Sequence, residues 1–183
     1  MGESIVAVVA ADLAWSTKLC GNQVVVGPET DQACRCAVAV AEAGDQQAEI
    51  LALAGYSSEF RVTMSDVMRA HMATVYGYPH LKMRSLGCLT ATFDTYGEMK
   101  TLAGVIKQMR APGTSEEMTI YLVCRWWHLP RAYFLLRAQF EPEAWYFLSI
   151  VKVFVPSRDC KGIIREPFAW LKNIPRMLQS VVC

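Results

Sequence analysis

The sequence predicts an α/β fold of the Rossmann-like kind, with three layers (α/β/α) and a mostly parallel sheet of five strands or slightly more. Short apolar runs alternate with segments of helical spacing, which is the pattern of repeated βαβ units. Of the 183 residues, 53% are hydrophobic and only 19% are charged, as expected for a sheet buried on both faces. No linker, repeat or low-complexity tract divides the chain, so residues 1–183 are expected to form a single domain.

Five apolar, β-prone runs are expected to be strands. They cover residues 5–9, 23–26, 50–53, 118–124 and 150–155. The segment 10–30 has the least regular pattern. It is expected to hold either an extra hairpin or a flap beside a ligand site, because irregular insertions at strand ends commonly do so.

Segments of helical spacing lie between and after these runs. They cover residues 31–43, 65–76, 95–109, 130–140 and 162–182. Asp94 or Thr95 can cap the third helix, and Pro130 suits the first turn of the fourth. Pro175 is expected to break or kink the last helix.

The charge pattern argues against a nucleic-acid partner. The 18 basic and 17 acidic residues give a net charge of +1 and form no long basic stripe. Basic residues do gather toward the end of the chain, which predicts a solvated helix face, with a membrane or RNA patch as the alternative. They are Lys152, Arg158, Lys161, Arg165, Lys172 and Arg176.

The sequence shows no secretory signal at its start and no apolar stretch of about 18 residues, so no transmembrane segment is expected. The seven cysteines are scattered without a CxxC pair, which argues against a disulfide framework or a zinc site. Cys34 and Cys36 would point in different directions on a helix. Reduced thiols, no metal and a cytoplasmic location are the expectation.

Polar residues that follow parallel strands should meet at the carboxyl edge of the sheet, where ligands bind in open α/β folds. One of them, His128, is expected to be catalytic, and the others to contact the ligand. The ligand-binding candidates are Asp12, Gly55, Ser57, Thr92, Asp94, Thr95, Trp127 and Arg131.

His128 carries the most informative pattern, because an apolar strand leads directly into it and then into a helix that Pro130 begins. We expect His128 to act as a general acid or base and Arg131 to hold an anion at the helix start. Thr95 would cap its helix and donate a hydrogen bond, and Asp12 would orient a ribose or a water. The alternative is a histidine bonded to the loop backbone beside a surface arginine.

Several stretches are also similar to a known family when taken in order. They resemble stretches of the YdcF-, SanA- and ElyC-like proteins, a bacterial domain of unknown function. The matching stretches are residues 37–44, 50–55, 77–79, 92–98 and 128–132, followed by Val155-Pro156-Ser157 and Glu166. The resemblance covers most of the chain. The clearest match is His128-Leu129-Pro130-Arg131-Ala132, which resembles the family's His-x-x-Arg-Ala motif.

The chain departs from this family at two places. Ala10-Ala11-Asp12-Leu13 stands where the family has a glycine-rich turn, and no acidic residue precedes the stretch that begins at Thr92. The resemblance implies a Rossmann-like sheet with a polar pocket, in a family without an agreed reaction.

Three functions follow as hypotheses. The first is a protein that binds a nucleotide-like or phosphorylated metabolite, with S-adenosylmethionine among the candidates, either without catalysis or as a transferase or hydrolase using His128. The second is a non-catalytic interaction module for cell-envelope or regulatory work, whose protein or membrane-surface contact is formed by nearby basic residues and by Trp126, Trp127, Trp145 and Trp170. The third is a nucleophilic Cys124 activated by His128. The expected partner is a small, anionic ligand; the cofactor is unknown, and a homo-oligomer is left open.

Overall fold

The computed structural model describes residues 3–10, 13–16, 23–43, 48–87, 95–110, 117–157 and 163–171, together with residues 173 and 175. For residues 13–16 and 23 only the backbone is described.

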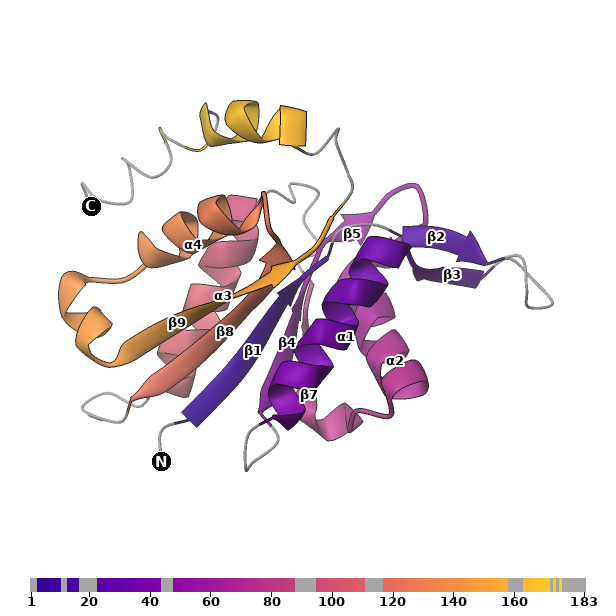
Figure 1. Cartoon of the computed structure of the whole chain (residues 1–183), viewed down its shortest axis with the longest axis horizontal. Coiled ribbons are helices and arrows are strands. Elements are labelled where there is room, and N and C mark those ends of the chain that lie inside the picture. Colours follow the sequence, from indigo (N-terminus) through magenta and orange to yellow (C-terminus); the bar gives the residue numbers. More distant parts are fainter. Residues whose placement is uncertain are drawn as a thin grey trace.

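The centre of the molecule is a five-stranded sheet in which every neighbouring pair is parallel (Figure 1). The strand order is β7-β4-β1-β8-β9. The strands are β1 (Glu3–Val9), β4 (Glu49–Leu53), β7 (Met83–Leu86), β8 (Met118–Arg125) and β9 (Leu148–Val155). With helices on both faces, this architecture confirms the predicted Rossmann-like fold.

The central strands are apolar throughout because they are buried on both faces. In β1, Ile5, Ala7 and Val9 pack into one core cluster, whereas Val6 and Val8 point into the other. This alternation follows from the two-residue period of a strand, and the burial of both faces explains why no polar residue interrupts the run 5–9.

Two helices cover each face of the sheet. Residues of α1 (Pro28–Glu42) and α2 (Met64–Tyr76) belong to the cluster on one face, and residues of α3 (Thr95–Met109) and α4 (Leu129–Arg137) belong to the cluster on the other (Figure 1). The connections therefore change face after β7. In the sheet, this places the topological switch point between the carboxyl ends of β1 and β8, where doubly wound folds bind their ligands.

All five predicted runs form strands, but only four of them belong to the central sheet. Residues 23–26 do not join the central sheet; as β3 (Gln23–Val26) they pair antiparallel with β2 (Leu13–Ser16). Both edges of β1 are already occupied by β4 and β8, which leaves no place beside it for this short strand. The extra hairpin expected within residues 10–30 is thereby confirmed, and β7 is the sheet strand that the prediction missed.

The helices begin and end where the sequence signals indicate, within a few residues. α1 starts at Pro28, three residues earlier than predicted, with the proline in its first turn. α2 ends at Gly77, whose φ of 69° is the left-handed conformation that glycine adopts readily. α4 ends at Arg137, before the short 3-10 helix η2 (Pro142–Tyr146). The 3-10 helix η1 (His80–Lys82) and the strand pair β5 (Tyr56–Ser57) and β6 (Val62–Thr63) complete the elements.

A further helix over residues 163–171 lies across the carboxyl edge of the sheet, above α4 in Figure 1. Asn173 and Pro175 are also helical. Within the described parts of the chain, we find no helix whose length and hydropathy would let it cross a membrane.

Candidate functional site

The candidate site begins at the turn that leads from β8 into α4. The backbone N–H of His128 donates to the carbonyl of Arg125 at 3.0 Å, which closes the turn. The N–H of Trp126 donates to the carbonyl of Val155 at 3.1 Å, which ties the turn to the end of β9. His128 is therefore held at the carboxyl edge of the sheet, directly before the first turn of α4.

Thr95, the first residue of α3, meets His128 at this edge. Its hydroxyl oxygen lies 2.9 Å from Nε2 of His128, in a hydrogen bond whose direction depends on the histidine tautomer. Thr95 is almost fully buried, whereas His128 stays partly exposed. Two residues that are distant in the sequence are thus joined through their side chains.

His128 is neutral at physiological pH. Burial lowers its pKa most, and the positive charges of Arg131 and Arg125 lower it further, to about 3. An uncharged imidazole can donate one hydrogen bond and accept another, and it can take up a proton. It has no proton to give as an imidazolium, so the general-acid role expected for His128 is unavailable until a bound anion offsets the two arginines.

We expect the imidazole of His128 to stay uncharged from pH 8 down to about pH 4, whereas a histidine in an unfolded chain titrates near 6.5. Between about pH 6.5 and 3 the unfolded chain binds a proton that the folded chain does not, so the free energy of unfolding should fall as the pH falls through this window. NMR titration of the His128 ring protons, assigned with a His128→Asn variant, checks this. A midpoint above about pH 5 would contradict it.

Arg131 lies beside His128 but is not free to hold an anion. Its Nε and Nη2 atoms donate to the two carboxylate oxygens of Glu166, at 2.6 and 3.2 Å. Both side chains are about nine-tenths buried. The role expected for Arg131, an open anion clamp, is therefore corrected: a carboxylate of the chain itself occupies the clamp, and an anionic ligand would have to displace it.

A second guanidinium at this edge is also paired. Nη1 of Arg125 lies 2.8 Å from Oε2 of Glu29, in the first turn of α1, and the same guanidinium stacks 4.7 Å from the ring centre of Trp127. The hydroxyl of Ser157 donates to Glu29 at 2.7 Å and accepts from the indole N–H of Trp127 at 3.4 Å. These contacts fasten the start of α1 to the ends of β8 and β9.

The other predicted residues lie elsewhere or outside the described residues. Gly55 follows β4 and its carbonyl accepts the N–H of Met64, while the hydroxyl of Ser57 accepts the N–H of Phe60. Because β1 separates β4 from β8, these two residues are about two strand spacings, or roughly 10 Å, from the His128 turn.

Three further predicted ligand-binding residues, Asp12, Thr92 and Asp94, lie outside the described residues.

Cys124 does not fit the nucleophile hypothesis. It is 2% exposed at the end of β8, its thiol donates to the backbone carbonyl of Arg125, and burial raises its pKa far above the ordinary value. A buried neutral thiol is a weak nucleophile. Over the described ranges, no three histidine, cysteine or acidic side chains are grouped closely enough to hold a metal ion.

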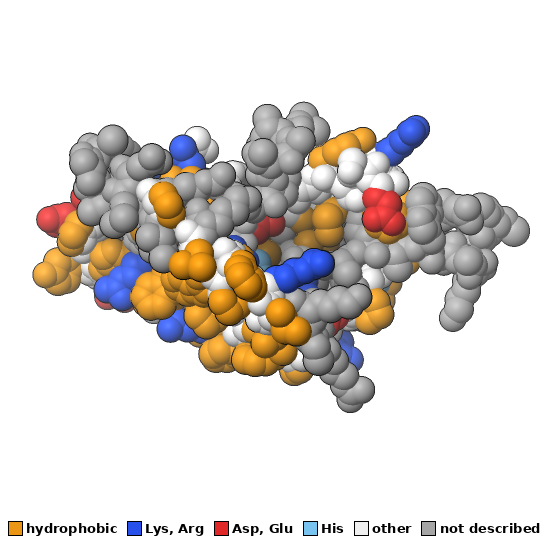
Figure 2. All heavy atoms as spheres, turned by 90° about the horizontal axis from the view of Figure 1, so that it is seen from above, with side chains coloured by type: hydrophobic (Ala, Val, Ile, Leu, Met, Phe, Trp, Pro, Cys, Tyr) orange, Lys and Arg blue, Asp and Glu red, His pale blue; other side chains and the backbone are white. Residues whose placement is uncertain are grey.

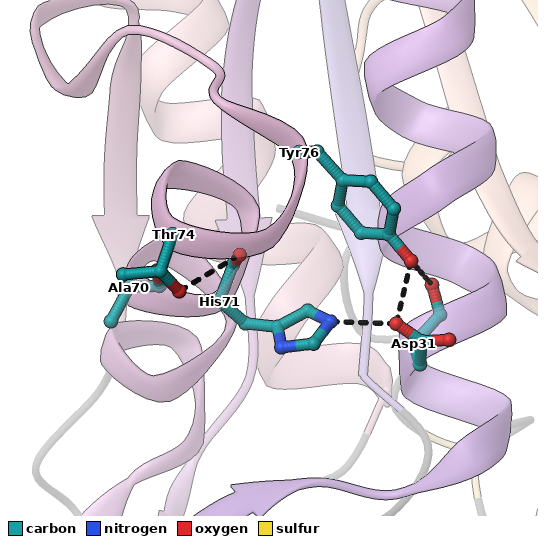
Figure 3. Close-up of polar contacts among 5 residues, drawn as sticks. All are labelled: Asp31, Ala70, His71, Thr74 and Tyr76. Carbon is teal, nitrogen blue, oxygen red and sulfur yellow. Dashed lines mark hydrogen bonds and ion pairs between the residues drawn. The ribbon is translucent and has the colours of Figure 1, made fainter.

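A separate polar cluster joins α1 to α2 (Figure 3). Nε2 of His71 and the hydroxyl of Tyr76 both lie 2.6 Å from one carboxylate oxygen of Asp31. Burial by itself raises the pKa of Asp31, but the hydrogen bonds from Tyr76 and His71 and the nearby positive charges bring it below its usual value. Burial and the bond to Asp31 raise the pKa of Tyr76 to about 12.

The neighbouring Cys34 is fully buried, and burial raises its pKa to about 12, so it adds no reactive thiol to this cluster. The charged group of the cluster, the carboxylate of Asp31, is hydrogen-bonded to His71 and Tyr76. Its contacts explain how α1 and α2 are held side by side on one face of the sheet.

Sequence reasoning missed Glu29 and Ser157 as members of the site. A signal for each was present: Glu29 follows the proline that starts a helix, and Ser157 follows an apolar strand. Comparison of the chain with protein-family models, with curated proteins and with solved structures finds no significant match in any of the three.

Proposed function

We propose that this chain binds a nucleotide-like or phosphorylated metabolite, S-adenosylmethionine among the candidates, at the carboxyl edge of its sheet beside His128. The observation that carries the proposal is the hydrogen bond between Thr95 and a partly exposed, neutral His128 near the topological switch point. A polar pair of this kind at that place in a doubly wound sheet is suited to hold a ligand. The family resemblance of residues 128–132 supports the same location.

Two buried or half-buried arginines flank the imidazole, and each is paired with a carboxylate. A phosphate that displaced Glu166 from Arg131 would bring about −1.5 to −2 charges to a position that the carboxylate occupies with −1. Its negative charge would also stabilise a protonated His128. In a catalytic version of this function, His128 would accept a proton from a substrate hydroxyl or water and then return it.

The experiment is a thermal-shift titration of the full chain with S-adenosylmethionine, adenine nucleotides and sugar phosphates. A ligand at about 100 times its Kd should raise Tm by roughly 5 to 10 °C for a chain of this size. His128→Ala should abolish the shift, whereas His80→Ala, a change at an exposed histidine in η1, should leave it intact. No shift with any ligand, or a shift that His128→Ala preserves, would contradict the proposal.

The alternative function, an interaction module built on tryptophans, gains little support from their positions. Trp127 and Trp145 are partly buried and stack against Arg125 and Arg137, and Trp170 packs edge-on against Phe134. Only Trp126, 45% exposed, is prominent on the surface. Trp127, Trp145 and Trp170 have separate intramolecular neighbours, so the tryptophans do not favour a shared docking surface.

A further inference from the structure

The helix over residues 163–171 has apolar residues on its exposed face and a polar residue on its buried face. Its polar residue Glu166 is buried against Arg131, and Asn173, two turns later, is 1% exposed. Ile164, Phe168 and Leu171 are 68%, 69% and 64% exposed. A surface helix normally places its apolar stripe toward the core and its polar residues outward. Here the apolar stripe is left facing away from the molecule.

The spacing of these residues fixes the two faces. Ile164, Phe168 and Leu171 stand at i, i+4 and i+7, which is one stripe of a helix, and Glu166 and Asn173 lie on the opposite side. The paired contacts between Arg131 and Glu166 prevent the helix from rotating to bury the stripe. Figure 2 looks down on this side of the molecule and shows hydrophobic side chains gathered on the face around the helix and α4.

We refer to Ile164, Phe168 and Leu171 as the outer stripe. Three side chains of this size expose on the order of 400 Å², about half of the roughly 800 Å² that each partner buries in a standard protein interface. The stripe is therefore too small to support a stable dimer by itself. It is of a size suited to shallow insertion of one helix face into the boundary of a lipid bilayer.

The charge of the surrounding sequence is complementary to an anionic surface. Arg165 lies beside the stripe and is exposed. The segment 158–176 contains five basic residues (Arg158, Lys161, Arg165, Lys172 and Arg176) and two acidic ones (Asp159 and Glu166), a balance of 5 − 2 = +3. One of the two acidic residues, Glu166, is already neutralised by Arg131. A basic helix with an exposed apolar stripe is typical of peripheral binding to anionic lipid.

We propose that the outer stripe of helix 163–171 is a docking surface for an anionic lipid bilayer. Ile164, Phe168 and Leu171 insert among the lipid headgroups and upper acyl chains, Arg165 lies against the lipid phosphates, and the net positive charge of the segment adds to the attraction. The inner face of the helix stays on the protein through Glu166.

The test is co-sedimentation of the full chain with vesicles of phosphatidylcholine alone and of phosphatidylcholine mixed with phosphatidylglycerol. We expect binding to the anionic vesicles at low salt, weaker binding at high salt, and little binding to neutral vesicles. The triple variant I164S/F168S/L171S should weaken binding by roughly tenfold or more. Arg165→Glu should weaken it as well.

The matched control is V75S/L81S, which removes two exposed apolar side chains on α2 and η1 and should bind like the unchanged chain. All five serine substitutions are at exposed positions, so circular dichroism melting should show each variant folded. Absence of binding to anionic vesicles at low salt, or equal binding by the triple variant, would overturn the proposal. A concentration-dependent dimer that the triple variant abolishes would instead assign the stripe to a second copy of the chain.

Discussion

Glu166→Ala is expected to lower the free energy of unfolding by about 3 kcal/mol, because it leaves the buried guanidinium of Arg131 without its carboxylate. Both carboxylate oxygens accept from Arg131, so both hydrogen bonds are lost at once. The change also removes the main polar anchor of helix 163–171. Urea denaturation, followed by circular dichroism, measures the effect, and limited proteolysis should show earlier cleavage near residues 163–171 than in the unchanged chain.

The double variant R131M/E166L is the control for this prediction. Removing both charges and keeping apolar volume should restore much of the lost stability, since replacing a complete buried ion pair by apolar residues is often neutral. If Glu166→Ala costs less than about 1 kcal/mol, the pair is exposed to water in solution and the buried geometry described above is wrong.

Gly87→Ala is the second change with a large expected effect, a loss of roughly 2 kcal/mol in the free energy of unfolding. Gly87 follows β7, and a Cβ added there would lie 2.3 Å from Cγ2 of Thr63 and 2.8 Å from the hydroxyl of Ser65. Neither atom can yield easily, because Thr63 is branched at Cβ and the hydroxyl of Ser65 is hydrogen-bonded to Ser85 at 2.7 Å. The strand or the start of α2 must therefore move.

Gly104→Ala is the control, and it is expected to raise the free energy of unfolding instead of lowering it. Gly104 is inside α3 and exposed, and a Cβ added there meets no atom within 4 Å. Alanine in a helix interior should stabilise the chain by up to about 1 kcal/mol, because glycine loses more backbone entropy on folding. Parallel urea denaturation of the two variants compares them directly; a Gly87→Ala chain as stable as the unchanged one would contradict the first expectation, and a clearly destabilised Gly104→Ala chain the second.

The strands that the sequence predicted are those with a mostly apolar run, including the edge strand β9, which is largely exposed. β1, β4 and β8 are continuous apolar runs, and their pattern indicates strands without further information. β7 was missed because Met83-Arg84-Ser85-Leu86 is only four residues long and has two polar residues in its middle, so it forms neither a continuous apolar run nor an alternating one. It is an edge strand, and Arg84 on it pairs with Glu49 of β4, a contact that becomes visible only once the two strands are paired.

The candidate site was predictable in its position but not in its chemistry. The strand-to-helix pattern placed His128 and Arg131 at a strand exit, and the start of α3 placed Thr95 near the same edge. The ion pair between Arg131 and Glu166 joins residues that are 35 positions apart in the sequence. The lowered pKa of His128 depends on its burial and on the two nearby arginines. Neither can be read from a local sequence pattern. The reversed polarity of helix 163–171 escaped prediction for the same reason, since periodicity alone orients an apolar stripe inward.

Because β1 lies in the centre of the sheet, it lacks one of its two neighbouring strands while most of the chain is being translated. Its residue Ile5 pairs with Ile120, 120 − 5 = 115 positions later. At translation rates of about 5 to 20 residues per second, one hydrogen-bonding edge of β1 waits roughly 6 to 23 s for its neighbour to be made. During that interval the nascent chain presents an unpaired apolar strand, and a ribosome-associated chaperone that covers it would prevent premature pairing with other chains.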